Sequence, residues 1–117
     1  MKDSLVFEKA FKFSIRIVNL YKYLVKEQRE YVLSKQILRS GTSIGANIKE
    51  GLYSQSKKDF ISKMNIALKE AAETEYWIEL LKETDYLKKD LSDSILSDAI
   101  EIRKMLTSIV KTSRENS

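Results

Sequence analysis

The chain contains no cysteine and no histidine, and these two absences remove most familiar catalytic and metal sites. Without cysteine there is no disulfide, no thiol nucleophile and no thiolate metal site. Without histidine there is no imidazole base, and the Glu-x-x-His pairs of di-iron helical bundles cannot form. The glycine-rich nucleotide patterns GxGxxG and GxxxxGK[ST] are absent as well. We therefore expect a protein that is not an enzyme and that needs no metal or cofactor.

Proline is also absent, and the three glycines all lie within residues 38–51. No apolar run approaches the roughly 18 residues that a membrane-spanning helix needs, and because the first residues mix charged and apolar side chains we expect no secretory signal among them. The chain has 117 residues, of which 43% are hydrophobic and 32% charged, a composition typical of one globular domain. We expect a single cytoplasmic domain over residues 1–117, without membrane association.

What the sequence does contain is helical periodicity, with apolar residues recurring every three or four positions. The predicted helices span about residues 3–26, 34–51, 56–84 and 90–112. The core face of the first helix is predicted to comprise Val6, Ala10, Phe13, Ile17, Leu20 and Leu24. Ser34 and Ser56 are expected to cap the second and third helices, and Gly51 to end the second. Short loops favour an all-α, antiparallel up-and-down four-helix bundle.

Two of the predicted helices carry a second stripe outside the core face. On the first helix it comprises Phe7, Phe11, Val18 and Val25, and on the third Ile66, Glu70, Glu73, Trp77 and Leu80. Scattered apolar residues are common on protein surfaces, but large side chains aligned at one helical spacing favour an interface. We therefore expect a homo-oligomer.

Polar residues predict contacts between the second and third helices. The carboxylates of Glu70 and Glu73 need partners if they are buried, because an unpaired buried charge is strongly unfavourable. The predicted network comprises Arg39, Ser43, Asn47, Glu50, Glu70, Glu73 and Trp77, either within one subunit or between subunits. Acid–base catalysis by the two carboxylates is the alternative, but no nucleophile, imidazole or phosphate-binding loop accompanies them.

Gly41 and Gly45 lie four residues apart on the apolar side of the predicted second helix, beside Ile44. A glycine inside a helix costs about 0.5–1 kcal/mol relative to alanine. The two glycines are therefore expected to provide space, so that a neighbouring backbone or a large side chain such as Phe13 or Phe60 can approach closely.

The net charge of +4 is unevenly distributed. Residues 1–40 carry nine Lys and Arg against four Asp and Glu, a balance of +5, whereas residues 41–117 have a balance of −1. On the first helix, Lys9, Lys12 and Arg16 share one face. Such a face can bind the phosphates of RNA or DNA, or it can simply be solvated. No helix-turn-helix or other sequence-reading module is recognisable.

The segment QILRSGTSIGANIKEG, followed by DFISKMNIALKEAAETEYWIELL, resembles the small four-helix-bundle proteins encoded in intervening sequences of bacterial 23S ribosomal RNA genes. The matching positions are Arg39, Ser43, Ile44, Asn47, Ile48, Glu50, Gly51, Phe60, Ile66, Ala67, Glu70 and Glu73. The family pattern usually has Gly-Ser after Ile-Ala, whereas this chain has Leu68 and Lys69. The surface of the third helix is therefore expected to differ locally from that of its relatives.

The resemblance implies a ring-like homopentamer with no enzymatic activity. It also implies nucleic-acid binding, and a related branch of the family serves diversity-generating retroelements as a partner of their reverse transcriptase. The leading hypothesis is a non-enzymatic bundle that binds RNA or DNA non-specifically through a basic surface. The alternative is a protein–protein adaptor or scaffold, with an exposed patch formed by Tyr21, Tyr31, Tyr53 and Tyr86.

Overall fold

The computed structural model describes residues 4–116, which form four α-helices and, within that range, no β-strand. The helices are α1 (Leu5–Lys26), α2 (Leu33–Leu52), α3 (Lys57–Glu83) and α4 (Lys89–Glu115). The prediction of an all-α protein with four helices is confirmed. The last helix continues to Glu115 rather than ending near residue 112, and the predicted start at residue 3 lies outside the described residues.

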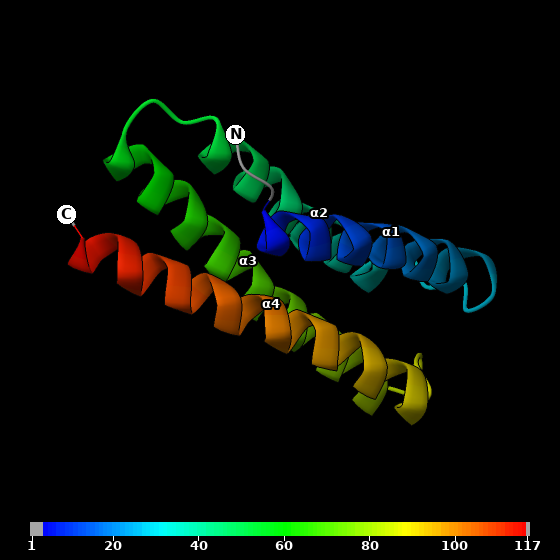
Figure 1. Ribbon diagram of the computed structural model, residues 1–117. Helices are drawn as coiled ribbons and strands as arrows, with labels where there is room; N and C mark the ends of the chain where they lie inside the picture. The colour runs from blue at the N-terminus through cyan, green and yellow to red at the C-terminus, as the bar shows by residue number, and fades with distance from the viewer. Residues whose placement is uncertain (1–3, 117) are drawn as a thin grey trace.

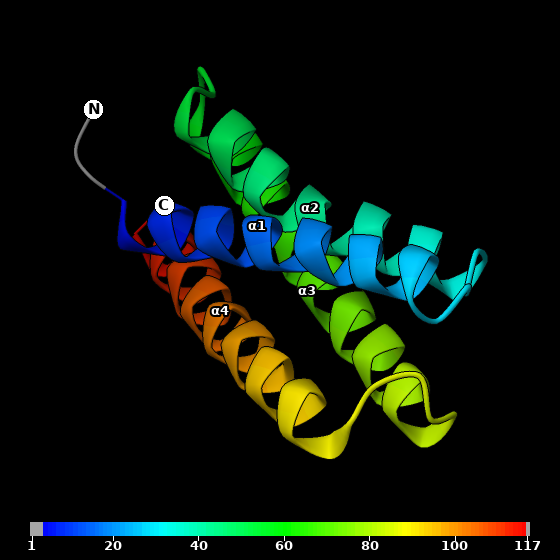
Figure 2. The same ribbon diagram turned by 90° about the vertical axis from the view of Figure 1, so that its right-hand side faces the viewer.

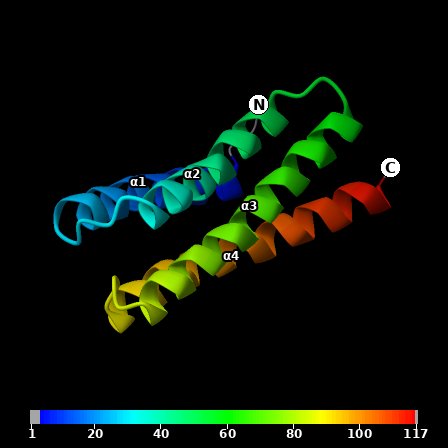
Figure 3. The ribbon, with the colours of Figure 1, turned by 180° about the vertical axis from the view of Figure 1, so that it is seen from behind.

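Consecutive helices lie side by side. In Figures 1 and 3, α1 runs along α2 and α3 runs along α4, and in Figure 2 the first pair crosses the second at an angle. The α1–α2 and α3–α4 loops lie at one end of the molecule in Figure 1, and the α2–α3 loop lies toward the other. The result is elongated, with extents of 46 × 22 × 19 Å. α2 packs extensively against both α1 and α3, whereas α1 and α4 share a much smaller contact.

The predicted core face of α1 is buried in full. Each of its six residues lies at or below 5% exposure, because the three- and four-residue spacing keeps them on one side of the helix. On α2, the buried apolar line of Ile37, Ile44 and Ile48 follows the same rhythm. The core therefore extends along the axis of the molecule, with one buried stripe from each helix.

The start of α2 corrects the predicted cap at Ser34. The helix begins at Leu33, and Ser34 is buried within its first turn. The cap comes instead from Glu30 in the preceding loop, whose carboxylate accepts backbone N–H groups of Val32 at 3.1 Å, Leu33 at 3.0 Å and Ser34 at 2.6 Å. Burial alone would raise the pKa of Glu30, but these backbone hydrogen bonds outweigh it and lower that pKa.

Two predictions concern the boundary between α2 and α3: the cap at Ser56 is confirmed, and the helix stop at Gly51 is wrong. Ser56 caps α3, because its hydroxyl accepts the backbone N–H of Asp59 at 3.0 Å. α2 ends at Leu52, one residue beyond the predicted end, but Gly51 is itself helical and has no positive φ, so it is not the residue that stops the helix. A Cβ on Gly51 would lie 2.8 Å from Met64 Cε and 3.2 Å from Lys63 Cβ. This glycine therefore lets α2 approach α3.

The other two glycines line the seam between α1 and α2. A Cβ on Gly41 would lie 2.8 Å from two side-chain carbons of Ile17. At Gly45 the nearest atoms would be Ser14 Oγ at 3.4 Å and the carbonyl oxygen of Ala10 at 3.6 Å. The close approach at this seam thus involves these α1 residues, rather than the phenylalanines that the sequence suggested.

Candidate functional site

The basic face of α1 that the sequence singled out lies along α4. Lys9 Nζ is 3.2 Å from Glu101 Oε1. Arg16 Nη1 donates to Asp98 Oδ2 at 2.7 Å, and Arg16 Nη2 donates to Ser94 Oγ at 2.8 Å. Two of the three predicted cations therefore face carboxylates of their own chain, which reduces the charge they can offer to a phosphate.

A surface hollow of about 340 Å³ lies between these two helices. Its lining includes Lys9, Lys12 and Arg16 on one side and Asp98 and Glu101 on the other. The charges of the lining therefore sum to only +1. This hollow is poorly suited to bind a polyanion, because the acids that hold the cations in place also repel phosphate.

Unpaired cations lie along the exposed, outward side of α1, beginning with Lys12 at the edge of this hollow. Lys12, Lys22 and Lys26 are exposed, and none of them has an ion-pair partner among residues 4–116. Because successive residues of a helix are rotated by about 100° around its axis, these three positions lie within about 80° of one another on one side of α1. The sequence interpretation missed Lys22 and Lys26, although their helical phase relative to Lys12 could have indicated them.

The outward side of α1 also exposes large apolar side chains. Phe11 is 56% exposed and Ile15 is 51% exposed. The Phe11 ring lies beside Phe7, with 6.1 Å between the ring centroids. Lys49 of α2 covers the other part of this stripe, with its Nζ 5.3 Å from the Phe7 centroid. The predicted second stripe of α1 is thus partly covered by α2 and is most open at Phe11.

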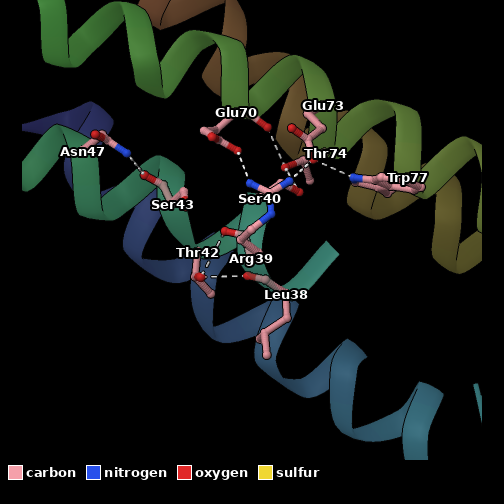
Figure 4. Close-up of polar contacts among 10 residues, drawn as sticks. All are labelled: Leu38, Arg39, Ser40, Thr42, Ser43, Asn47, Glu70, Glu73, Thr74 and Trp77. Atoms are coloured by element: carbon pink, nitrogen blue, oxygen red, sulfur yellow. Dashed lines mark hydrogen bonds and ion pairs between the residues drawn. The ribbon is translucent and has the colours of Figure 1, made fainter. Parts of the chain in front are cut away.

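The second group of predicted site residues meets between α2 and α3, as Figure 4 shows. Arg39 Nη1 donates to Glu70 Oε1 at 3.2 Å, and Arg39 Nη2 donates to Glu73 Oε2. Trp77 Nε1 donates to the same Glu73 oxygen at 2.9 Å. One guanidinium therefore holds two carboxylates, and one of these also fixes the indole. The Arg39 side chain remains 48% exposed, so this cluster lies at the surface of the seam.

Two buried hydroxyls lie beside this cluster. The oxygens of Ser40 and Thr74 are 3.0 Å apart, and the Thr74 hydroxyl also lies 2.7 Å from the Glu70 carbonyl oxygen that accepts from it. Both residues are fully buried. Within residues 4–116, every buried side-chain nitrogen or oxygen has a hydrogen-bond partner. The seam therefore has no unused buried polar group to offer a ligand, and its arrangement is that of a structural contact.

Three residues predicted for the polar network make contacts outside the cluster around Arg39. Asn47 donates its side-chain N–H to the backbone oxygen of Ser43 at 2.8 Å. Glu50 pairs with Lys63 of α3 at 3.0 Å. Of the four α2 residues that the sequence placed on one side, Arg39 is the one that reaches the two α3 carboxylates.

The described residues offer little other chemistry. Across residues 4–116, no group of three or more Asp and Glu side chains is placed to hold a metal ion. Within the same range, none of the helices is both long and apolar enough to cross a membrane.

Comparison with known proteins identifies close relatives. The family described as 23S rRNA-intervening sequence protein matches residues 2–108. A crystal structure of a protein of unknown function, from the S23 ribosomal protein family of Bacteroides thetaiotaomicron, is 61% identical to this chain. The match covers 92% of this chain and 99% of that one, with a TM-score of 0.91. No curated protein matches the chain.

Proposed function

The chain belongs to the 23S rRNA-intervening sequence protein family, and from this premise we propose that it is a non-enzymatic bundle that binds RNA or DNA. The proposed bundle is antiparallel and up-and-down, acts in the cytoplasm and assembles into a ring-like homo-oligomer. The observation that carries the nucleic-acid proposal is the outward face of α1, where Lys12, Lys22 and Lys26 have no acidic partner among the described residues.

The lysines on this face suit phosphate contacts. Lys12 and Lys26 are fourteen residues apart, which is about 21 Å along a helix. Lysines that neutralise phosphates release counterions, so such binding weakens steeply as salt rises. It does not distinguish sequences, because the phosphates are the same along the strand. Lys9 and Arg16 would add less to binding, since Glu101 and Asp98 already compensate their charge.

Self-association is supported by the apolar residues next to these lysines. The side chains of Phe11 and Ile15 are exposed to water in the single chain, and a contact between two copies would bury them. Assembly into a ring would repeat the lysine row once per subunit and strengthen the positive potential around it. The proposed ring has five subunits, a number that rests on the family resemblance alone.

Nucleic-acid binding is tested by fluorescence anisotropy with a labelled single-stranded RNA and a labelled DNA duplex of unrelated sequences. We expect both to bind, with affinity falling steeply between roughly 50 and 200 mM salt and changing little with sequence. Absence of salt-sensitive binding to either polymer at low ionic strength would contradict the proposal.

Self-association is tested by light scattering on the variant Phe11→Glu, which places a charge in the exposed apolar face of α1. We expect a smaller species than the wild-type protein, with unchanged helix content by circular dichroism. Val32→Glu is the matched control, because Val32 is 70% exposed in the α1–α2 loop, away from that face. A monomeric wild type, or a Phe11 variant of wild-type mass, would overturn this part of the proposal.

The second candidate function is a protein–protein adaptor. The four tyrosines that the sequence suggested for its surface do not form one patch. Tyr31 and Tyr53 are exposed, but they lie at opposite ends of α2, while Tyr21 and Tyr86 are half-buried. An adaptor function therefore requires another surface, and the candidate that we propose for it is the seam between α3 and α4.

A further inference from the structure

The seam between α3 and α4 is hollowed where α3 begins and α4 ends. Two adjoining hollows of about 340 and 420 Å³ share Arg114 in their linings. Their apolar lining is aliphatic and comes from Ile61, Leu68 and Val110. We call this surface the α3–α4 groove. Farther along the seam, the ion pair of Arg103 with Glu75 at 2.5 Å joins the two helices.

The rim of the α3–α4 groove is basic. Lys57, Lys58, Lys111 and Arg114 line it, and among the described residues none of the four has a carboxylate within ion-pair distance. Lys57 Nζ donates to a backbone oxygen, that of Asn116, at 2.6 Å. The acidic side chain on the lining is that of Glu115, which is exposed. The groove thus differs from the α1–α4 hollow, where acids compensate two of the three cations.

We propose that the α3–α4 groove binds an acidic amphipathic helix of a partner protein. The aliphatic lining suits the apolar face of such a helix, and the basic rim suits carboxylates on either side of that face. The stretch of α3 from Lys57 to Leu68 is about 16 Å long, or three helical turns. An occupant with apolar residues at positions i, i+4, i+7 and i+11 matches that length.

Nucleic acid fits the α3–α4 groove less well. Single strands are commonly held by aromatic side chains on which bases stack, and the lining of this groove contains none. A phosphate backbone would also leave the aliphatic lining without an apolar partner. The residues that line the groove belong to α3 and α4 and include none of α1, so this proposal stands independently of nucleic-acid binding by α1.

The probe for this proposal is a fluorescein-labelled synthetic helix of about 18 residues, with leucine every third or fourth position and glutamate at the others. We expect it to bind and to shift the NMR methyl signals of Ile61, Leu68 and Val110. A peptide with lysine in place of glutamate should not bind, and a scrambled peptide of the same composition should bind about tenfold more weakly. Absence of binding, or shifts confined to other helices, would overturn the proposal.

Two double variants with the same change in charge separate the groove from general electrostatics. Lys111→Glu with Arg114→Glu should weaken peptide binding by about tenfold or more. Lys22→Glu with Lys26→Glu should weaken DNA binding and leave peptide binding within about twofold. If glutamate at the end of α4 lowers helix content, Lys111→Gln with Arg114→Gln serves instead.

Three results would overturn the assignment of the groove. Equal loss of peptide binding in both double variants would show that the overall positive charge of the protein, rather than the groove, attracts the acidic peptide. A smaller oligomer in the Lys111 and Arg114 variant would make the groove a contact between copies. Displacement of the peptide by an oligonucleotide that shifts the same methyl signals would assign the groove to nucleic acid.

The two proposals can fail separately. If the protein does not bind DNA but still binds the peptide, the proposed function is removed and the α3–α4 groove proposal stands.

Discussion

Helix α1 has two neighbours, and its seams with them are of opposite character. Against α2 the packing is so close that a Cβ on Gly41 would lie 2.8 Å from side-chain carbons of Ile17. Against α4 the contact is small, and the ion pairs of Lys9 and Arg16 border a hollow of about 340 Å³. The first seam is determined by the size of side chains, and the second by their charge.

The two seams have different roles: one holds α1 in place, and the other determines which side chains α1 offers to a ligand. Close packing is sensitive to a single added carbon, whereas partly exposed ion pairs contribute only about 0–1 kcal/mol. The α1–α2 seam therefore fixes the position of the helix. The α1–α4 seam decides instead which basic side chains remain free, and it compensates two of the three that the sequence selected.

The strongest test of the α1–α2 seam is Gly41→Ala. The new methyl group would collide with Ile17, which is fully buried and has little room to move. We expect unfolding free energy to fall by about 1–3 kcal/mol, although alanine is the better helix former. Urea denaturation followed by circular dichroism measures this change. A variant as stable as the wild type would show that the seam is not closely packed.

Glu30→Gln tests the loop that connects α1 to α2. At about pH 7 the variant loses the charge that accepts three backbone N–H groups, and we expect a loss of about 0.5–2 kcal/mol. Because the pKa of Glu30 is lowered from 4.5, its contribution is complete above that value and disappears as pH falls through the folded-state pKa. Unfolding measured from about pH 7 down to about pH 3 should show the two proteins converging. A constant difference would contradict a role for the charge.

Arg16→Ala tests the α1–α4 seam. Its ion pair with Asp98 is partly exposed, with side-chain exposures of 35% and 47%. We expect a loss of about 0.2–1 kcal/mol that becomes smaller at high salt, measured by thermal unfolding at two salt concentrations. Lys12→Ala is the control, since Lys12 has no acidic partner among the described residues. A salt-independent loss above about 2 kcal/mol would mean that this seam also positions α1.

The smallest effect is expected for Gly45→Ala. Its Cβ would meet Ser14 Oγ at 3.4 Å, close to ordinary contact, and the serine side chain can rotate. The gain in helix propensity should offset any crowding, so that stability changes by no more than about 0.5 kcal/mol. Parallel urea titrations compare it with Gly41→Ala. Equal destabilisation by both substitutions would contradict the difference between the two glycines.

The helices and the core could be predicted because their signals are local. Apolar residues three and four apart fix one face of a helix whatever it packs against. The cap of α2 was missed because it depends on the loop: Arg29 adopts a positive φ of 53°, and the Glu30 carboxylate reaches the first turn of the helix. Gly51 was misread for a related reason, since the closeness of α3 at that point leaves no trace in the α2 sequence.

The candidate site was only partly predictable. That Lys9, Lys12 and Arg16 share a face follows from their spacing. Which of them is compensated depends on α4, because the two acidic partners are 92 and 82 residues away in the chain. Arg39 was correctly placed near acidic residues of α3, since both stripes are regular over several turns. Its neighbours Ser43 and Asn47 form a local contact instead.

The central claim is that the uncompensated lysines of α1, rather than Lys9 and Arg16, which pair with acids of α4, bind nucleic acid. The direct test compares DNA binding of two double variants that lose equal charge: Lys12→Ala with Lys22→Ala, and Lys9→Ala with Arg16→Ala. The measurement is the slope of log affinity against log salt for a generic duplex. We expect the first pair to reduce the slope by about 1.8 per chain and the second by less than about half of that. Equal reductions, or a larger one in the second pair, would contradict the claim.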